Sequence, residues 1–174
     1  MTKIYQQNDF EKARKQKNKV KAIYFIVFAV FILIAVALYV LYTLQPYKGG
    51  LIPLIKWSVY GVTALFVVFS FIYLGIPYKR VKNYYKILSG ISVGTHSKTM
   101  GKFARYSESL QVRDGIEFKG LFFMEYSEKK QDWFERKVLF DSEKQFPEFQ
   151  ANETVTYYTH GNILVGYEKN IKKD

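Results

Sequence analysis

Two long apolar runs occupy most of residues 22–78, and this stretch constrains the fold more than any other feature of the sequence. It contains no Asp or Glu, and its only cations, Lys48 and Lys56, lie in or beside the short segment that separates the runs. At ~1.5 Å per residue, helices over residues 22–44 and 53–78 are each long enough to cross a hydrocarbon core of ~30 Å. We therefore predict a membrane hairpin of two transmembrane helices, joined by a short external connector at residues 45–52.

The composition of the two runs limits what the hairpin can do alone. Residues 22–47 and 57–78 contain no Asp, Glu, Lys, Arg or His, and ion pathways or proton relays need polar groups inside the hydrocarbon. Small residues let transmembrane helices approach closely, which makes Gly61, Ala64 and Gly75 candidate contacts with a partner helix. The hairpin is thus predicted to be an anchor and docking element.

The net charge of +11 raises the question of nucleic-acid binding. Seven Lys or Arg residues precede the first run, two lie between the runs, and four follow shortly after the second. From residue 87 onward, thirteen cations are balanced by thirteen Asp or Glu residues, so the excess charge flanks the apolar runs and predicts no nucleic-acid site. Because Lys and Arg concentrate on the cytoplasmic side of membrane helices, we predict a multi-pass protein of a bacterial cell membrane with both termini cytoplasmic.

The flanking cations are predicted to lie against anionic headgroups of the bilayer. These membrane-surface residues are Lys12, Arg14, Lys15, Lys17, Lys19, Lys21, Lys79, Arg80, Lys82 and Lys86. Residues 1–21 have few apolar positions and predict a basic arm that is disordered or a frayed helix. Residues 79–90 predict a juxtamembrane helix or linker that either continues the second helix or lies on the membrane surface, with Gly90 as its stop.

Residues 91–168 change to an alternating pattern that predicts a small cytoplasmic all-β domain. Strands are expected near residues 91–93 and over residues 103–113, 116–126, 132–141, 154–159 and 163–168, with Asp114-Gly115 as a two-residue hairpin turn. Five or six mostly antiparallel strands of this length predict an SH3-like or OB-like barrel. Residues 169–174 are expected to be a flexible tail.

Few residues of this domain point to chemistry. The chain has no cysteine, and no phosphate-binding loop, catalytic triad or metal-ligand spacing occurs, so we predict no cofactor, no metal site and no enzymatic activity. His96 and His160 are expected to be structural, His160 in an exposed turn. The carboxylates of Asp141, Glu143, Glu148 and Glu153 are expected to lie in a solvated loop.

Adjacent aromatic residues in three strands point to a binding surface. Side chains alternate between sheet faces, so one ring of each pair should face away from the core. The candidate contacts are Phe122, Trp133 and Tyr157. We therefore predict a scaffolding or protein-interaction module that binds another membrane or peripheral protein, or a second copy of the chain. The alternative is a small accessory subunit of a transporter or channel that makes contact through its hairpin.

Overall fold

The computed structural model describes residues 1–46 and 49–169, which form two compact units. The hairpin unit is Lys15–Lys82. The barrel unit combines Met1–Arg14 with the residues from Asn83 onward. The first fourteen residues therefore belong to the barrel, although they are separated from it in sequence by the whole hairpin.

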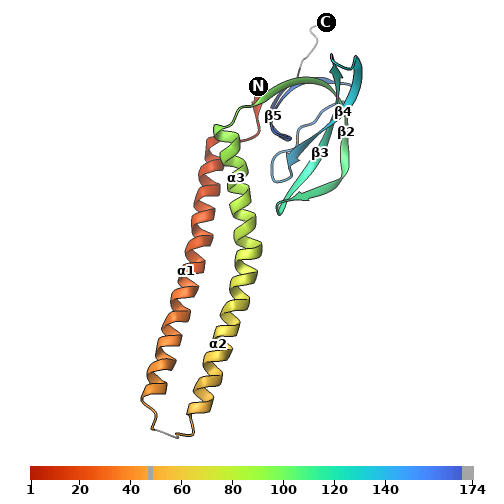
Figure 1. The fold of residues 1–174 in the computed structure, drawn as a ribbon. Helices are drawn as coiled ribbons and strands as arrows, with labels where there is room; N and C mark the ends of the chain where they lie inside the picture. The colour runs from red at the N-terminus through yellow and green to blue at the C-terminus, as the bar shows by residue number, and fades with distance from the viewer. Residues whose placement is uncertain (47–48, 170–174) are drawn as a thin grey trace. The chain divides into compact units, whose positions relative to one another are not determined.

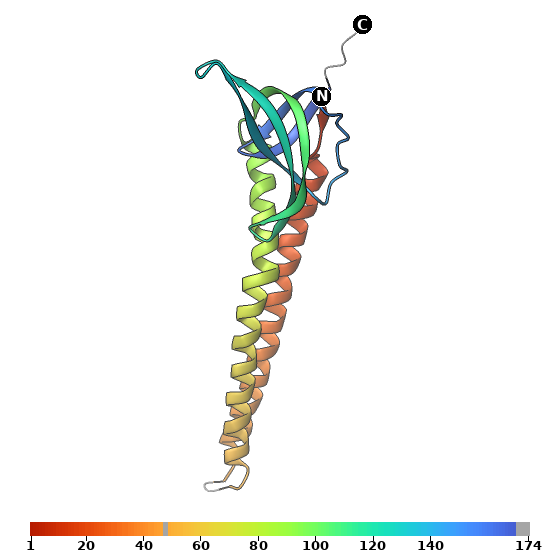
Figure 2. The same cartoon turned by 90° about the vertical axis from the view of Figure 1, so that its right-hand side faces the viewer.

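The hairpin unit is built from α1 (Gln7–Thr43) and α2 (Ile52–Tyr73), which run side by side in both views (Figures 1 and 2). The residues least exposed on each helix recur three or four positions apart, as packing along one face of a helix requires. Within the hairpin unit they include Tyr24, Val27, Phe31, Ala35 and Leu38 on α1, and Ile55, Val62, Phe66, Phe69 and Tyr73 on α2. Phe31 and Phe66 stack with ring centroids 4.4 Å apart, and the Tyr73 hydroxyl donates to the Val20 carbonyl at 3.0 Å. By length and composition, both helices qualify as membrane spans.

Proline at position 77 does not end the second helix. A π-helical turn, η1 (Leu74–Tyr78), contains Pro77 and leads directly into α3 (Lys79–Val93). Proline has no amide hydrogen, and a π turn relaxes the hydrogen-bond ladder where that donor is missing. Residues 79–90 thus continue the second helix, which ends at Val93 and does not stop at Gly90.

The barrel unit contains a closed five-stranded mixed sheet with one extra strand. Its strands are β2 (Ser97–Arg113), β3 (Ile116–Ser127), β4 (Asp132–Asp141), β5 (Thr154–His160) and β6 (Ile163–Lys169). The order β6-β4-β3-β2-β5 closes through β5–β6 pairing, and β4–β6 is the parallel pair. The extra strand β1 (Thr2–Lys3) pairs with β6, opposite Tyr167 and Gly166.

The long strand β2 closes the barrel by changing partner along its length. Its first part, up to Lys102, pairs with β5, and the remainder pairs with β3. Two register shifts in the β2–β3 ladder bend the strand between these partners. The predicted turn is present: Asp114 and Gly115 have φ of 56° and 79°, as a type I′ hairpin requires.

Two apolar clusters stabilise the barrel unit. The first fills the barrel and includes Phe123, Phe140 and Tyr157, whose exposure is 0%. The second lies between the sheet, α3 and the start of α1, and it is formed by Ala13, Leu88, Ile91, Ile116, Phe118, Leu139, Ile163 and Val165. Consecutive residues of β4 enter different clusters, Phe140 the first and Leu139 the second, so the end of this strand is covered on both faces.

The sequence predictions differ from the structure at two places for the same reason. The strand expected at residues 91–93 is the last turn of α3, where Ile91 is buried in the second cluster. Of the two alternatives for residues 1–21, the helix is present from Gln7, and it is preceded by β1, which the sequence does not predict. In both places the structure depends on contacts between residues that are far apart in the sequence. A local apolar pattern does not reveal such contacts.

Candidate functional site

An aromatic surface decorated with cations covers the outer side of β2, β3 and β4. We call it the aromatic–cationic face and define it by Lys102, Arg105, Phe122, Tyr126, Trp133 and Lys137. Tyr126 and Trp133 are opposite each other in the β3–β4 ladder, with ring centroids 5.5 Å apart and exposures of 51% and 48%. Such rings on a sheet surface offer a large apolar area at little conformational cost.

The cations of this face lie over its rings. The Lys102 ammonium is 5.2 Å from the centre of Trp133, and the Arg105 guanidinium is 4.1 Å from the centre of Phe122. Lys137 approaches the same phenyl ring at 5.4 Å. Arg105 also donates two hydrogen bonds to Glu135, at 3.1 and 3.2 Å. Since Glu135 neutralises one of the three cations, the face retains a positive charge suited to an acidic ligand.

A buried polar cluster lies at the end of β4. Asp141 has 0% exposure, and its Oδ2 accepts hydrogen bonds from the hydroxyls of Tyr84 at 3.1 Å and Tyr5 at 3.4 Å. Its Oδ1 accepts from the Glu143 amide at 3.0 Å. The prediction that Asp141 lies in a solvated loop is therefore wrong, because α3 and the N-terminal segment cover this end of the strand.

Burial raises the pKa of Tyr5 and of Tyr84, and the negative charge of Asp141 raises both further. Both hydroxyls therefore keep their protons and act as donors at neutral pH. The cluster joins three parts of the barrel unit: the N-terminal segment, α3 and β4. The cluster has a structural role, because both hydroxyls already donate hydrogen bonds to the same carboxylate.

A second buried carboxylate lies within the barrel. Glu125 accepts a hydrogen bond from the Tyr157 hydroxyl, and Arg136 approaches it at 3.4 Å. Burial raises the pKa of Glu125, although the Arg136 charge opposes this shift. The Tyr157 side chain is therefore buried in the core and has no surface for a partner, so its prediction as a partner contact is wrong. The outward ring of that pair is Tyr158.

The two histidines lie near each other, with ring centroids 6.4 Å apart. His96 Nε2 is 2.8 Å from the Ile91 carbonyl, so it carries the proton and donates. The ring of His160 packs against α3: a Cβ added at Gly90 or Gly94 would lie 2.9 or 2.4 Å from it. His160 therefore contacts the helix and does not occupy a free turn. No group of three or more His, Asp or Glu suited to a metal ion occurs among the described residues.

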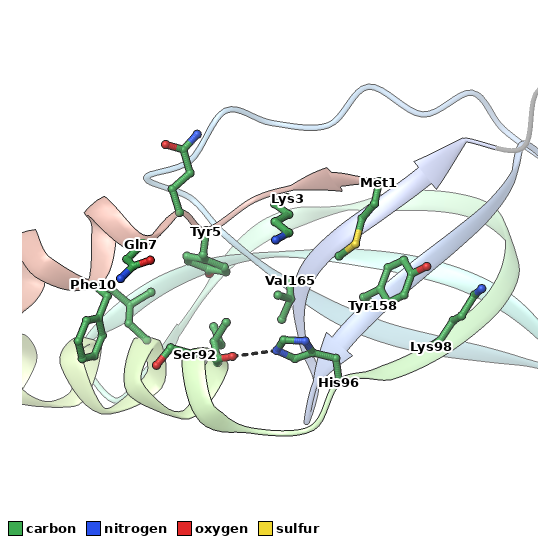
Figure 3. Close-up of a pocket in the computed structure, with 13 residues that line it drawn as sticks. Met1, Lys3, Tyr5, Gln7, Phe10, Ser92, His96, Lys98, Tyr158 and Val165 are labelled. Atoms are coloured by element: carbon green, nitrogen blue, oxygen red, sulfur yellow. Dashed lines mark hydrogen bonds between the residues drawn. The ribbon is translucent and has the colours of Figure 1, made fainter.

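A groove of about 820 Å³ opens elsewhere on the barrel unit, and Figure 3 shows its walls. Met1, Lys3 and Tyr5 line one side, and Ser92 and His96 line the opposite side. Phe10 lies at one end and Lys98 with Tyr158 at the other (Figure 3). Leu88, Ile91 and Val165 complete the apolar part of the wall.

The other predicted residues are distributed over both units. Gly61, Ala64 and Gly75 are exposed on α2 and η1, and a Cβ added at Gly61 or Gly75 would meet nothing within 4 Å. The predicted membrane-surface cations lie on α1 and α3, and all are exposed except Lys17, which is half-buried. Only Lys12, Arg14 and Lys86 of this set belong to the barrel unit.

The sequence predicts Phe122 and Trp133 of the aromatic–cationic face but not Tyr126, and it gives no sign of Tyr5, Tyr84 or the burial of Asp141. Tyr5 and Asp141 are 136 positions apart, so no local pattern links them. Comparison with family models, with curated proteins and with solved structures gives no match for this chain.

Proposed function

We propose that the chain is an integral protein of the cell membrane whose hairpin anchors a cytoplasmic binding module. The absence of ionisable residues from 22–47 and 57–78 supports insertion. The distribution of Lys and Arg supports an orientation in which both termini and the barrel unit are cytoplasmic, with residues 45–52 on the opposite side.

Cysteine labelling tests this placement cleanly, because the natural chain contains no cysteine. Gly50→Cys places a thiol in the connector, and Lys129→Cys places one in the exposed β3–β4 turn. A membrane-impermeant maleimide added to intact cells should label the first variant only, and cell lysis should expose the second. Labelling of Lys129→Cys in intact cells would refute the orientation.

The barrel is, we infer, of the OB type. The strand order and the parallel β4–β6 pair support this assignment over an SH3-like barrel. In OB-type barrels the second and third strands carry the ligand face, and in this chain those strands are β3 and β4. The aromatic–cationic face lies on these strands.

This face is proposed to bind an acidic segment of another protein, and its exposed Tyr126–Trp133 pair is the observation that carries the proposal. Exposed aromatic residues beside cations are typical of protein-interface hot spots. The cations already lie over Trp133 and Phe122, so these rings present few open faces for stacking bases. A protein segment with Asp or Glu beside apolar residues complements both features of the face.

Photocrosslinking in intact membranes tests the binding role. A photoreactive amino acid in place of Met124, which lies between Phe122 and Tyr126 on the same face, should capture a defined protein that mass spectrometry identifies. Trp133→Ala combined with Lys102→Glu should abolish this capture. Exposed Val112 provides a matched control, since Val112→Ala should leave it unchanged. Recovery of only uncrosslinked chain, or capture that survives the double substitution, would refute the proposal.

The second candidate function is an accessory subunit of a transporter or channel. The exposed positions Gly61, Ala64 and Gly75 favour it, because they fall on the side of the helix away from the residues that pack against α1. Replacement of residues 22–78 by an unrelated membrane hairpin separates the two candidates. Capture through the aromatic–cationic face should survive this replacement, whereas a subunit that binds through its hairpin would lose its partner.

A further inference from the structure

We propose that the groove bounded by β1, α3 and the start of β2 binds an acidic amphiphile, a molecule with one alkyl chain and a carboxylate or phosphate head. This inference concerns a different surface from the aromatic–cationic face and goes beyond the proposed protein-binding role. All thirteen residues that line the groove belong to the barrel unit. Its volume of about 820 Å³ falls within the range of ~300–1,000 Å³ typical of sites for one small molecule.

The apolar wall provides the place for the alkyl chain. Leu88, Ile91 and Val165 belong to the second core cluster and also line the groove, and Phe10 packs against the same cluster. These side chains come from α1, α3 and β6, so the wall is fixed by three elements of the packed unit. Leu88, Ile91 and Val165 are already nearly buried, so an alkyl chain laid on this wall would mainly remove the apolar surface of Met1 and Phe10 from water, without any rearrangement of the core.

Two lysines of the groove favour an amphiphile with an anionic head. Lys3 and Lys98 approach from β1 and β2, and no Asp or Glu occurs among the described residues that line the groove. In Figure 3 the side chain of Lys3 extends from β1 toward Val165. An anionic head beside Lys3 would accept charge-assisted hydrogen bonds from its ammonium, and such bonds are stronger than neutral ones. Lys98 adds positive charge at the end of the groove, where its ammonium lies 5.9 Å from the centre of the Tyr158 ring.

Neighbouring polar groups do not offset the charge of the two lysines. His96 uses Nε2 to donate to the Ile91 carbonyl, so the hydrogen bonds to an anionic head are supplied by the lysines. The carboxylate of Glu168 lies nearby, but it accepts from the Tyr158 hydroxyl at 3.3 Å and pairs with the Met1 ammonium at 3.4 Å. Glu168 therefore already has hydrogen-bond and ion-pair partners within the barrel unit. A cationic head would meet two lysines and no carboxylate among the described residues that line the groove.

Photoaffinity labelling of the full chain tests this inference. The protein is placed in nanodiscs of zwitterionic phosphatidylcholine and irradiated with a dodecanoic acid that carries a diazirine on its alkyl chain. The label should attach to peptides from residues 3–10 and 88–98, and excess dodecanoate or dodecyl phosphate should suppress it. The competitor that acts at the lower concentration identifies the preferred head. Suppression in nanodiscs that contain lysophosphatidylglycerol, a membrane lipid with one acyl chain, would identify membrane lipid as the source, and its absence would identify a free amphiphile.

Charge-reversal variants provide the matched control. Lys3→Glu combined with Lys98→Glu should lower labelling of the groove by at least about tenfold. Lys129→Glu combined with Lys130→Glu changes the net charge equally in the distant β3–β4 turn and should leave labelling unchanged. Ser92→Trp should block the groove without a change in charge, while unaltered hydrogen exchange of the barrel core verifies the fold. Labelling spread over the whole chain, equal labelling by the matching diazirine alcohol, or labelling insensitive to Lys3 and Lys98 would overturn the inference.

Discussion

Asp141 is a buried carboxylate held by two tyrosines that are far from it in the sequence. Tyr5 reaches it from the N-terminal segment and Tyr84 from α3, and both donate to the same oxygen. A buried hydrogen bond to a charged group contributes more than one between neutral groups, and removal of the acceptor leaves buried donors unsatisfied. This cluster is therefore expected to be the most sensitive polar site of the barrel unit.

Substitution within this cluster should destabilise the barrel unit. Tyr84→Phe should lower its free energy of unfolding by about 1.5–3 kcal/mol, and Asp141→Ala should have the larger effect because it deprives two hydroxyls of their acceptor. Urea unfolding of the full chain in detergent measures this, with Trp133 as sole fluorescent reporter in a Trp57→Phe background. Tyr126→Phe, at an exposed position, is the control that should leave the midpoint unchanged. Equal midpoints for Tyr84→Phe and Tyr126→Phe would contradict the assignment.

The raised pKa of Tyr5 and Tyr84 predicts a loss of stability at alkaline pH. An unfolded tyrosine releases its proton near pH ~10, whereas these folded hydroxyls retain theirs. Above that pH the unfolded chain therefore binds fewer protons than the folded chain, so stability is complete below pH ~10 and falls as the pH rises further. For Tyr5 the slope approaches about 1.4 kcal/mol per pH unit. Urea midpoints recorded from about pH 9 to 11 should fall steeply in the natural chain and less steeply after Tyr5→Phe with Tyr84→Phe.

At the level of elements, the N-terminal segment is a structural part of the barrel. β1 pairs with β6, the Ile4 amide donates to the Val165 carbonyl at 2.9 Å, and Asp9 pairs with Lys144 at 2.7 Å. Asp9 also accepts from the Gln6 amide at the start of α1, as an acidic residue in the first helical turn does. Burial pushes the pKa of Asp9 upward, but the Gln6 amide and Lys144 outweigh this effect and lower it.

Gly166 offers a way to weaken β1 alone. A Cβ at this position would lie 2.9 Å from the Thr2 carbonyl oxygen and 2.7 Å from the Met1 side chain, so β1 must move to admit it. Gly166→Ala should accelerate hydrogen exchange of the Ile4 amide while the β3–β4 ladder stays protected. Gly61→Ala is the control, because its Cβ meets nothing within 4 Å. Unchanged exchange at Ile4 in the Gly166 variant would mean that β1 adapts without losing its pairing.

The elements with a strong local signal are those that the sequence predicts well. The two apolar runs become α1 and α2, and the strand at residues 132–141 has the predicted bounds, as does the turn at Asp114-Gly115. Elements created by long-range packing are missed. β1 is two residues long and exists only because β6 lies beside it, and the burial of Asp141 depends on α3 and the N-terminal segment. The same distinction explains why the sequence predicts Phe122 and Trp133 as surface rings but does not predict the groove.

At the level of the whole molecule, the barrel unit is assembled from both sides of the hairpin in the sequence. Ala13 and Phe10, from before the hairpin, pack with Leu88 and Ile91, from after it. A fragment of residues 83–174 alone would leave apolar side chains of the second cluster in water. Residues 1–14 are thus required to complete a core, and the hairpin is not.

Because the barrel unit is built from residues 1–14 and the residues from Asn83 onward, the behaviour of two soluble fragments can be predicted. Residues 1–14 joined to residues 83–174 by a flexible Gly/Ser linker should yield a folded, monomeric barrel, because both clusters are then complete. Residues 83–174 alone should aggregate or unfold at lower denaturant concentration, since exposed contiguous apolar surface promotes association. Size-exclusion chromatography and the dispersion of amide NMR signals compare the two. If the shorter fragment were equally monomeric and equally dispersed, the N-terminal segment would be dispensable, and the groove that it lines would lack the fixed wall on which amphiphile binding depends.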